Sequence, residues 1–141
     1  MKNTMRELVR ALTSGDIEKM LSYLADDASW TAPEGSFKGK AELRKYATWL
    51  IQTIPDLSAV DSGIKTMAQG NIGIYEHIFS GTLKGRKWQS LSICIYEFQG
   101  DKIQSIRTVQ DRLSMARQAA AGVLDRWLVG SLVGTMEKGL R

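Results

Sequence analysis

Residues 72–98 read IGIYEHIFSGTLKGRKWQSLSICIYEF, two long runs of β-forming residues separated by Lys84-Gly85. Isoleucine, tyrosine and phenylalanine recur in both runs, and these residue types favour extended strands. Two residues are the length of a tight hairpin turn, and glycine readily adopts the positive φ that such a turn needs. This stretch therefore predicts an antiparallel β-hairpin in which Leu83 lies opposite Arg86.

The predicted register divides the side chains of the hairpin between two different faces. It places His77 opposite Ser92, and side chains alternate between the faces along each strand. One face carries aromatic and small polar side chains: Tyr75, His77, Phe79, Trp88, Ser90, Ser92, Cys94 and Tyr96. The other face is mostly aliphatic: Ile74, Glu76, Ile78, Gln89, Leu91, Ile93 and Ile95. The mixed face suits a pocket better than a dense core, because each buried hydroxyl or imidazole needs a partner.

The pattern of apolar residues and turn signals extends this hairpin into a whole domain. We expect helices over residues 3–13, 17–24 and 40–53, strands over residues 28–32, 57–68 and 103–110, and a final helix from near Asp111 that breaks near Gly122 or Gly130. Gly63 predicts a bulge or bend within the strand 57–68. Three helices followed by an antiparallel sheet indicate the α+β class.

Length and composition limit the classes of protein to which the chain can belong. Its 141 residues predict a single domain, with a core over about 4–120 and a C-terminal helical extension over about 121–141. One Cys and one His exclude a disulfide framework and a zinc site built from Cys and His alone. We expect neither a metal nor a cofactor.

Charge and hydropathy bear on partners and location. The net charge is +4, but the positive residues are spread along the chain, which is typical of solvated surface and predicts no nucleic-acid partner. No run of about 18 apolar residues is present, so we expect no membrane partner. The charged N-terminal segment lacks the apolar stretch of a signal peptide. These features favour a cytoplasmic protein.

Several short motifs occur in an order typical of one superfamily. They are Ser14-Gly15-Asp16, Leu24-Ala25-Asp26-Asp27-Ala28, Gly35, Gly39-Lys40, Ile54-Pro55-Asp56-Leu57 and Gly100-Asp101-Lys102-Ile103. Together they resemble the nuclear-transport-factor-like superfamily, and the SnoaL-like polyketide cyclases within it. The resemblance implies a cone-shaped, curved antiparallel sheet wrapped around N-terminal helices and enclosing a cavity. It also implies a homodimer through the outer sheet face, here followed by an extra C-terminal helix.

The activities of this superfamily can be compared with the chain residue by residue. Leu8, Ala32 and Cys94 stand where ketosteroid isomerases carry their Tyr and two Asp, which argues against that reaction. The stretch 90–94 also lacks the carboxylate that limonene epoxide hydrolase requires. The ester cyclases are more similar, because Asp111, Leu113 and Gln118 match their Asp, Leu and Gln in spacing. Their Glu-His-Trp is replaced by Ser105-Ile106-Arg107, the His of their Gly-Thr-His by Leu83, and their long hairpin insertion is missing.

The catalytic candidates are therefore Asp111 and His77, and each has a structural alternative. The resemblance makes Asp111 a general acid/base for an intramolecular aldol closure, whereas its place between a strand and a helix is that of an N-cap. His77 would polarise or orient the substrate, or else serve as a hydrogen-bonded packing residue. An exposed, cap-bonded Asp111 would favour a binding protein, and a carboxylate aimed into a closed cavity would favour an enzyme.

The remaining candidates are ligand contacts: Trp30, Trp49, Tyr75, Phe79, Trp88, Ser90, Ser92, Cys94 and Thr108. Trp30 is alternatively plain core, and a buried free Cys94 usually behaves as a small hydrophobe. Arg107 either pairs with Glu76 or Glu97 on the outer face or anchors an anionic ligand. The sequence thus predicts a protein that binds a small hydrophobic or aromatic, polyketide-like molecule, as a cyclase or isomerase or as a non-catalytic binding or dimerisation module.

Overall fold

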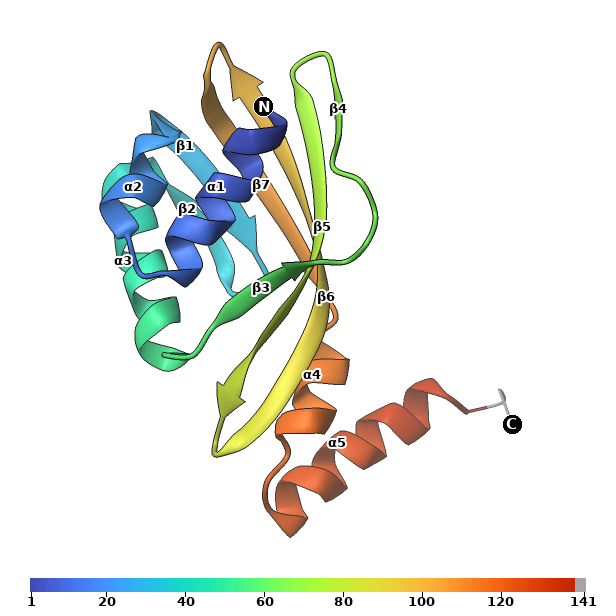
Figure 1. The fold of residues 1–141 in the computed structure, drawn as a ribbon. Helices are drawn as coiled ribbons and strands as arrows, with labels where there is room; N and C mark the ends of the chain where they lie inside the picture. Colours follow the sequence, from blue (N-terminus) through green and yellow to red (C-terminus); the bar gives the residue numbers. More distant parts are fainter. Residues whose placement is uncertain (139–141) are drawn as a thin grey trace.

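A curved sheet wraps around three N-terminal helices in the computed structural model, which describes residues 1–138 (Figure 1). The helices α1 (Lys2–Thr13), α2 (Ile17–Ser22) and α3 (Gly39–Thr53) lie against its concave face (Figure 1). The apolar side chains of Met5, Leu8 and Leu12 recur on one face of α1 and are fully buried or nearly so. This α+β arrangement is the predicted fold class.

The strands form one sheet in the order β2-β1-β7-β6-β5-β3, and β4 also pairs with β5. Their bounds are β1 Leu24–Ala32, β2 Gly35–Lys38, β3 Ser58–Asp61, β4 Met67–Gln69, β5 Ile72–Leu83, β6 Arg86–Gln99 and β7 Lys102–Gln110. The pairs are antiparallel except β1 with β7, which are parallel. This parallel pair corrects the expectation of an antiparallel sheet. It places the first strand of the chain beside the last one.

The β5–β6 hairpin has the predicted register. Leu83 lies opposite Arg86 and His77 opposite Ser92. Lys84 and Gly85 both have positive φ, 50° and 74°, which is the conformation of a type I′ turn. The mixed face points inward, and its eight side chains are all buried. The aliphatic face points outward.

Three boundaries differ from the prediction. The strand expected over 57–68 is divided into β3 and β4, because the chain bends at Gly63, whose φ is +97°. Strand β1 begins at Leu24 rather than residue 28, and α2 ends at Ser22, so Leu24 belongs to the strand and not to the predicted helix. Strand β2 was not predicted at all: Pro33-Glu34 forms a two-residue turn that pairs Ala32 with Gly35.

The C-terminal segment forms two helices, α4 (Arg112–Ala119) and α5 (Val123–Met136), which break at Gly122 as expected. Gln118 attaches α4 to β6, because its side-chain amide accepts from the Gln89 N–H at 3.0 Å and donates to the Gln89 carbonyl at 2.8 Å. The end of the predicted extension, residues 139–141, lies outside the described residues. Within residues 1–138, no helix has the length and apolar character needed to cross a membrane.

Candidate ligand-binding site

The inward face of the hairpin places His77 among aromatic rings. The imidazole is fully buried, 4.8 Å from the Tyr75 ring and 4.5 Å from the Phe79 ring between centroids. Burial lowers the pKa of His77 to about 4, because charging an imidazole away from water is costly. The side chain is therefore neutral at pH 7.

Several polar atoms of this interior lack a hydrogen bond of ordinary geometry. Within residues 1–138, these atoms are both ring nitrogens of His77, Ser92 Oγ, Trp88 Nε1 and the Tyr96 hydroxyl. Buried polar groups in folded proteins are nearly always hydrogen-bonded. Of these residues, only Trp88 lines the inner cavity described next.

The inner cavity next to this face is small, about 40 Å³. Four predicted ligand contacts line it: Trp30, Phe79, Trp88 and Thr108. The Trp30 indole N–H donates to Thr108 Oγ1 at 2.9 Å, and Cys94 Sγ lies 3.3 Å from the same oxygen. Pockets for drug-sized ligands usually measure about 300–1,000 Å³. Aromatic side chains therefore fill most of the space that the sequence predicts as a binding cavity.

The other predicted contacts lie elsewhere. His77, Ser90, Ser92 and Cys94 are buried in the wall and are not among the residues that line the inner cavity. Tyr75 contributes instead to a pocket of about 140 Å³ between α1 and the edge of the sheet. The structure thus brings together only part of the predicted site.

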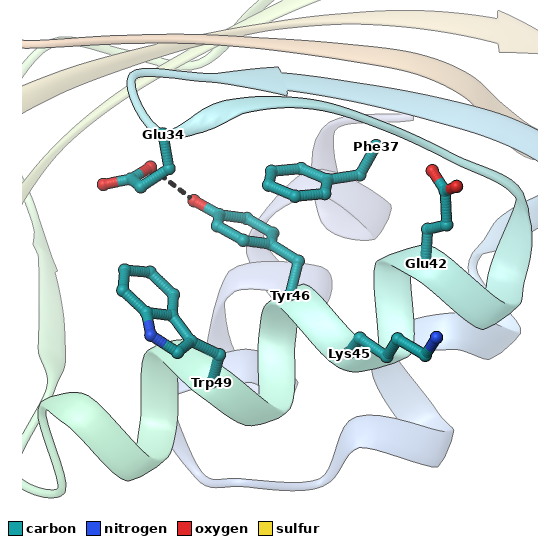
Figure 2. A pocket seen from close by; sticks show the side chains of 6 residues that line it. All are labelled: Glu34, Phe37, Glu42, Lys45, Tyr46 and Trp49. Atoms are coloured by element: carbon teal, nitrogen blue, oxygen red, sulfur yellow. Dashed lines mark hydrogen bonds between the residues drawn. The ribbon is translucent and has the colours of Figure 1, made fainter.

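A larger pocket, about 460 Å³, lies between α3 and the β1–β2 hairpin (Figure 2). It is lined by Glu34, Phe37, Glu42, Lys45, Tyr46 and Trp49. We call this space the outer pocket. Trp49 is its only member that we predicted from the sequence. Glu34 and Phe37 were missed with the β1–β2 hairpin, although Pro33-Glu34-Gly35 followed by Ser36-Phe37 carries the signal of a turn and a short strand. Glu42, Lys45 and Tyr46 lie on the predicted helix, but the pocket that they line forms only against that hairpin.

Three aromatic rings form one wall of the outer pocket. Phe37 stacks on Tyr46 at 4.3 Å between ring centroids and 13° between planes, and Trp49 lies 6.1 Å from Tyr46 at 22°. Tyr46 and Trp49 are three residues apart on α3, which places them on the same helix face. Trp49 keeps 46% of its surface exposed, so a ligand can reach its indole.

Glu34 and Tyr46 line both the outer pocket and the inner cavity. The Tyr46 hydroxyl donates to Glu34 Oε2 at 3.0 Å (Figure 2), and Arg112 Nη1 donates to Glu34 Oε1 at 2.6 Å. Burial, followed by the charge of Glu34, raises the pKa of Tyr46 well above its usual range. The hydroxyl therefore stays protonated and remains a donor. These two side chains form the wall between the two spaces.

Comparison with known proteins identifies the family to which this architecture belongs. The sequence profile described as SnoaL-like domain matches residues 5–106. The chain belongs to the SnoaL-like family. The predicted resemblance is thus confirmed, and the matched region ends before α4. No curated protein matches the SnoaL-like chain at a significant level.

Solved structures with the same fold are distant in sequence. A hypothetical protein from Catenulispora acidiphila with a ketosteroid isomerase-like fold, in complex with trimethylamine, is 15% identical with a TM-score of 0.77, over 84% of this chain and 93% of its own. A putative SnoaL-like polyketide cyclase from Jannaschia is 11% identical with a TM-score of 0.75, over 85% and 91%. IdmH, a putative polyketide cyclase from Streptomyces antibioticus, is 18% identical with a TM-score of 0.72, over 84% and 97%. At these identities the likeness establishes the fold alone.

Asp111 in this SnoaL-like domain has the geometry of a helix cap. Its carboxylate is exposed, and Oδ1 accepts from the Ser114 N–H at 2.9 Å at the start of α4. Asp111 is not among the residues that line the inner cavity. Together with the attachment of Gln118 to β6, this capping gives the cyclase-like spacing a structural explanation. The geometry favours the capping interpretation over the acid/base role that the resemblance implied.

Proposed function

We propose that this SnoaL-like domain binds a small, planar, largely apolar molecule in the outer pocket. The observation that carries the proposal is the wall of Phe37, Tyr46 and Trp49 beside a space of about 460 Å³. A flat aromatic ligand would stack on such a wall, and offset or edge contacts between rings contribute about 0.5–1.5 kcal/mol beyond burial of area. The volume lies within the range of small-molecule sites.

The polar side chains at the ends of the wall would orient the ligand. Glu34 lies at one end, and Glu42 and Lys45 lie toward the other (Figure 2). A few polar groups around an apolar surface are typical of specific small-molecule sites. Two of the structural neighbours are described as putative polyketide cyclases, which is compatible with a ring-bearing ligand.

We assign binding rather than a reaction. Glu34 is the carboxylate best placed for proton transfer, but Tyr46 and Arg112 already hold both of its oxygens. Asp111 is occupied as a cap. Hydrogen bonds within the chain therefore account for both carboxylates, and ligand binding explains the pocket without assigning either of them a role in proton transfer.

A second candidate is binding of a small polar molecule in the inner cavity. It is favoured by Trp88 Nε1, which lacks a hydrogen bond of ordinary geometry within residues 1–138 and belongs to the lining of this cavity. A ligand larger than a few atoms would have to displace the aromatic side chains that fill this space. The structure therefore supports ligand binding in the outer pocket more strongly than in the inner cavity.

Binding in the outer pocket can be tested with 2-naphthylmethanol, a neutral planar probe, followed by the indole N–H signals of the four Trp residues in NMR spectra. The signal of Trp49 should shift, and Trp49→Leu should weaken binding of the probe. The matched control is Trp127→Leu on α5, because Trp127 is 65% exposed and distant from the pocket in sequence and element. Equal binding by both variants, or a shift confined to the buried Trp30 and Trp88, would contradict the proposal.

We also propose a homodimer through the outer sheet face. Leu91 and Val109 are 46% and 64% exposed on that face, and the half-buried Ile93 lies next to both. Contiguous exposed apolar surface is typical of interfaces. Pairing two copies would remove this surface from water.

A further inference from the structure

The acidic side chains of the outer pocket already have hydrogen-bond donors. Glu34 accepts from Tyr46 and from Arg112, one donor on each carboxylate oxygen. Glu42 Oε2 accepts from the Lys38 N–H at 2.7 Å, which satisfies a backbone donor at the start of α3. A ligand in this pocket is therefore not required to supply donors to either carboxylate.

Lys45, in contrast, has no hydrogen-bond acceptor within residues 1–138. It is one of three cations on α3, and the other two are engaged: Lys40 pairs with Asp26 and Arg44 with Glu18. Lys45 lines the outer pocket and makes no ion pair or hydrogen bond with any residue in 1–138. It precedes Trp49 by one helical turn on α3, and its side chain extends toward the Glu42 end of the pocket, away from the Trp49 indole (Figure 2).

We infer that the ligand of the outer pocket is a planar aromatic acid, whose rings stack along the wall of Phe37, Tyr46 and Trp49 and whose anionic group pairs with the Lys45 ammonium at the Glu42 end of the pocket. The inference rests on the proposed function and adds the charge of the ligand to it. The anionic group can be a carboxylate or an acidic phenol, since both supply a charged acceptor for the Lys45 ammonium. The ring matches the exposed indole of Trp49, and the charge matches Lys45, a solvent-exposed cation with no ion pair to residues 1–138.

Glu42 lies three residues before Lys45 and opposes this pairing. Its carboxylate would repel an anion at the same end of the pocket, whereas the charge of Glu34 is offset by Arg112. The two residues should therefore act in opposite directions on the affinity for an acid. Exposed ion pairs contribute little, so we expect changes of about two- to five-fold in Kd for each substitution.

The experiment compares three probes that share one ring system: 2-naphthoate, 2-naphthylmethanol and 2-naphthylmethylammonium. Their Kd values are measured at pH 7 and low salt from the shift of the Trp49 indole signal. The acid should bind most tightly, and added salt should remove its advantage. Lys45→Gln should weaken the acid only, Glu42→Gln should strengthen it, and Lys65→Gln, an exposed lysine on the β3–β4 connection, should change nothing.

The outcomes separate this inference from the proposed function. If the neutral probe binds through Trp49 but the acid has no advantage, or if the ammonium binds best, the charge assignment is wrong and the proposed function stands. The charge assignment also fails if Lys45→Gln and Lys65→Gln weaken the acid equally. If none of the three probes shifts Trp49, the proposed function itself fails.

Discussion

The Tyr46 hydroxyl donates a 3.0 Å hydrogen bond to Glu34, and these two side chains together separate the outer pocket from the inner cavity. Arg112, at the start of α4, holds the other oxygen of Glu34. The C-terminal helices are thereby linked to the pocket, although they lie beyond the region that matches the SnoaL-like profile.

This relationship predicts the effect of removing the Tyr46 hydroxyl. Tyr46→Phe keeps the stacked ring but leaves Glu34 with Arg112 as its remaining side-chain donor. We expect a loss of about 1–2 kcal/mol in the free energy of unfolding, because hydrogen bonds to charged groups contribute about 1.5–3 kcal/mol and water partly screens this half-buried one. Urea unfolding measures the change. Tyr23→Phe is the control, since the Tyr23 hydroxyl makes no hydrogen bond within residues 1–138, and an equal loss in both variants would contradict the assignment.

The buried imidazole of His77 should make the stability of the fold depend on pH. Its pKa is lowered from 6.5 to about 4 in the folded chain. Above pH 6.5 the imidazole is neutral in both states. Between pH 6.5 and 4 the unfolded chain binds a proton that the folded chain does not. The free energy of unfolding should therefore decrease as the pH is lowered through this range, by up to about 3 kcal/mol at 1.36 kcal/mol per pKa unit.

The measurement is chemical unfolding across pH 4–8 for the wild type and His77→Phe. Because His77 is the only histidine of the chain, the variant should lose most of the slope between pH 6.5 and 4. A wild type whose stability is flat over this window would show that the imidazole is not buried in a neutral form.

The helix cap formed by Asp111 predicts that Asp111→Asn and Asp111→Ala differ in stability. Asp111→Asn keeps an oxygen that accepts from the Ser114 N–H and should change stability little. Asp111→Ala removes the cap and should cost about 0.5–2 kcal/mol. Thermal unfolding and the α4 amide signals would report the loss. Probe binding in the outer pocket should be unchanged in both variants, and a loss specific to Asp111→Asn would restore a chemical role for the carboxylate.

The dimer proposal is tested by placing a charge on the outer sheet face. Ile93→Lys should yield a monomer or an aggregate, because it introduces an ammonium into the proposed apolar interface. Light scattering coupled to gel filtration measures the mass. The control is Leu132→Lys on α5, where exposed apolar side chains form a competing surface. Dissociation by Leu132→Lys alone would move the interface to α5.

The sequence alone was sufficient for the features that depend on near neighbours. The two-residue turn at Lys84-Gly85 sets the register of β5 and β6, and alternation along each strand then assigns every side chain to a face. The same local reasoning located the helices approximately and left two positions for the C-terminal break, Gly122 and Gly130, of which the structure has the first. It also predicted two possible roles for Asp111 but could not choose between them.

Only the tertiary structure decided which side chains share a site. The contact between Trp30 and Thr108 joins residues 78 positions apart, and the parallel pairing of β1 with β7 has a similar span. Exposure of Asp111, filling of the inner cavity and formation of the outer pocket all depend on how distant elements pack. Strand periodicity specifies the direction of a side chain, whereas the volume left in front of it is set by residues remote in the sequence.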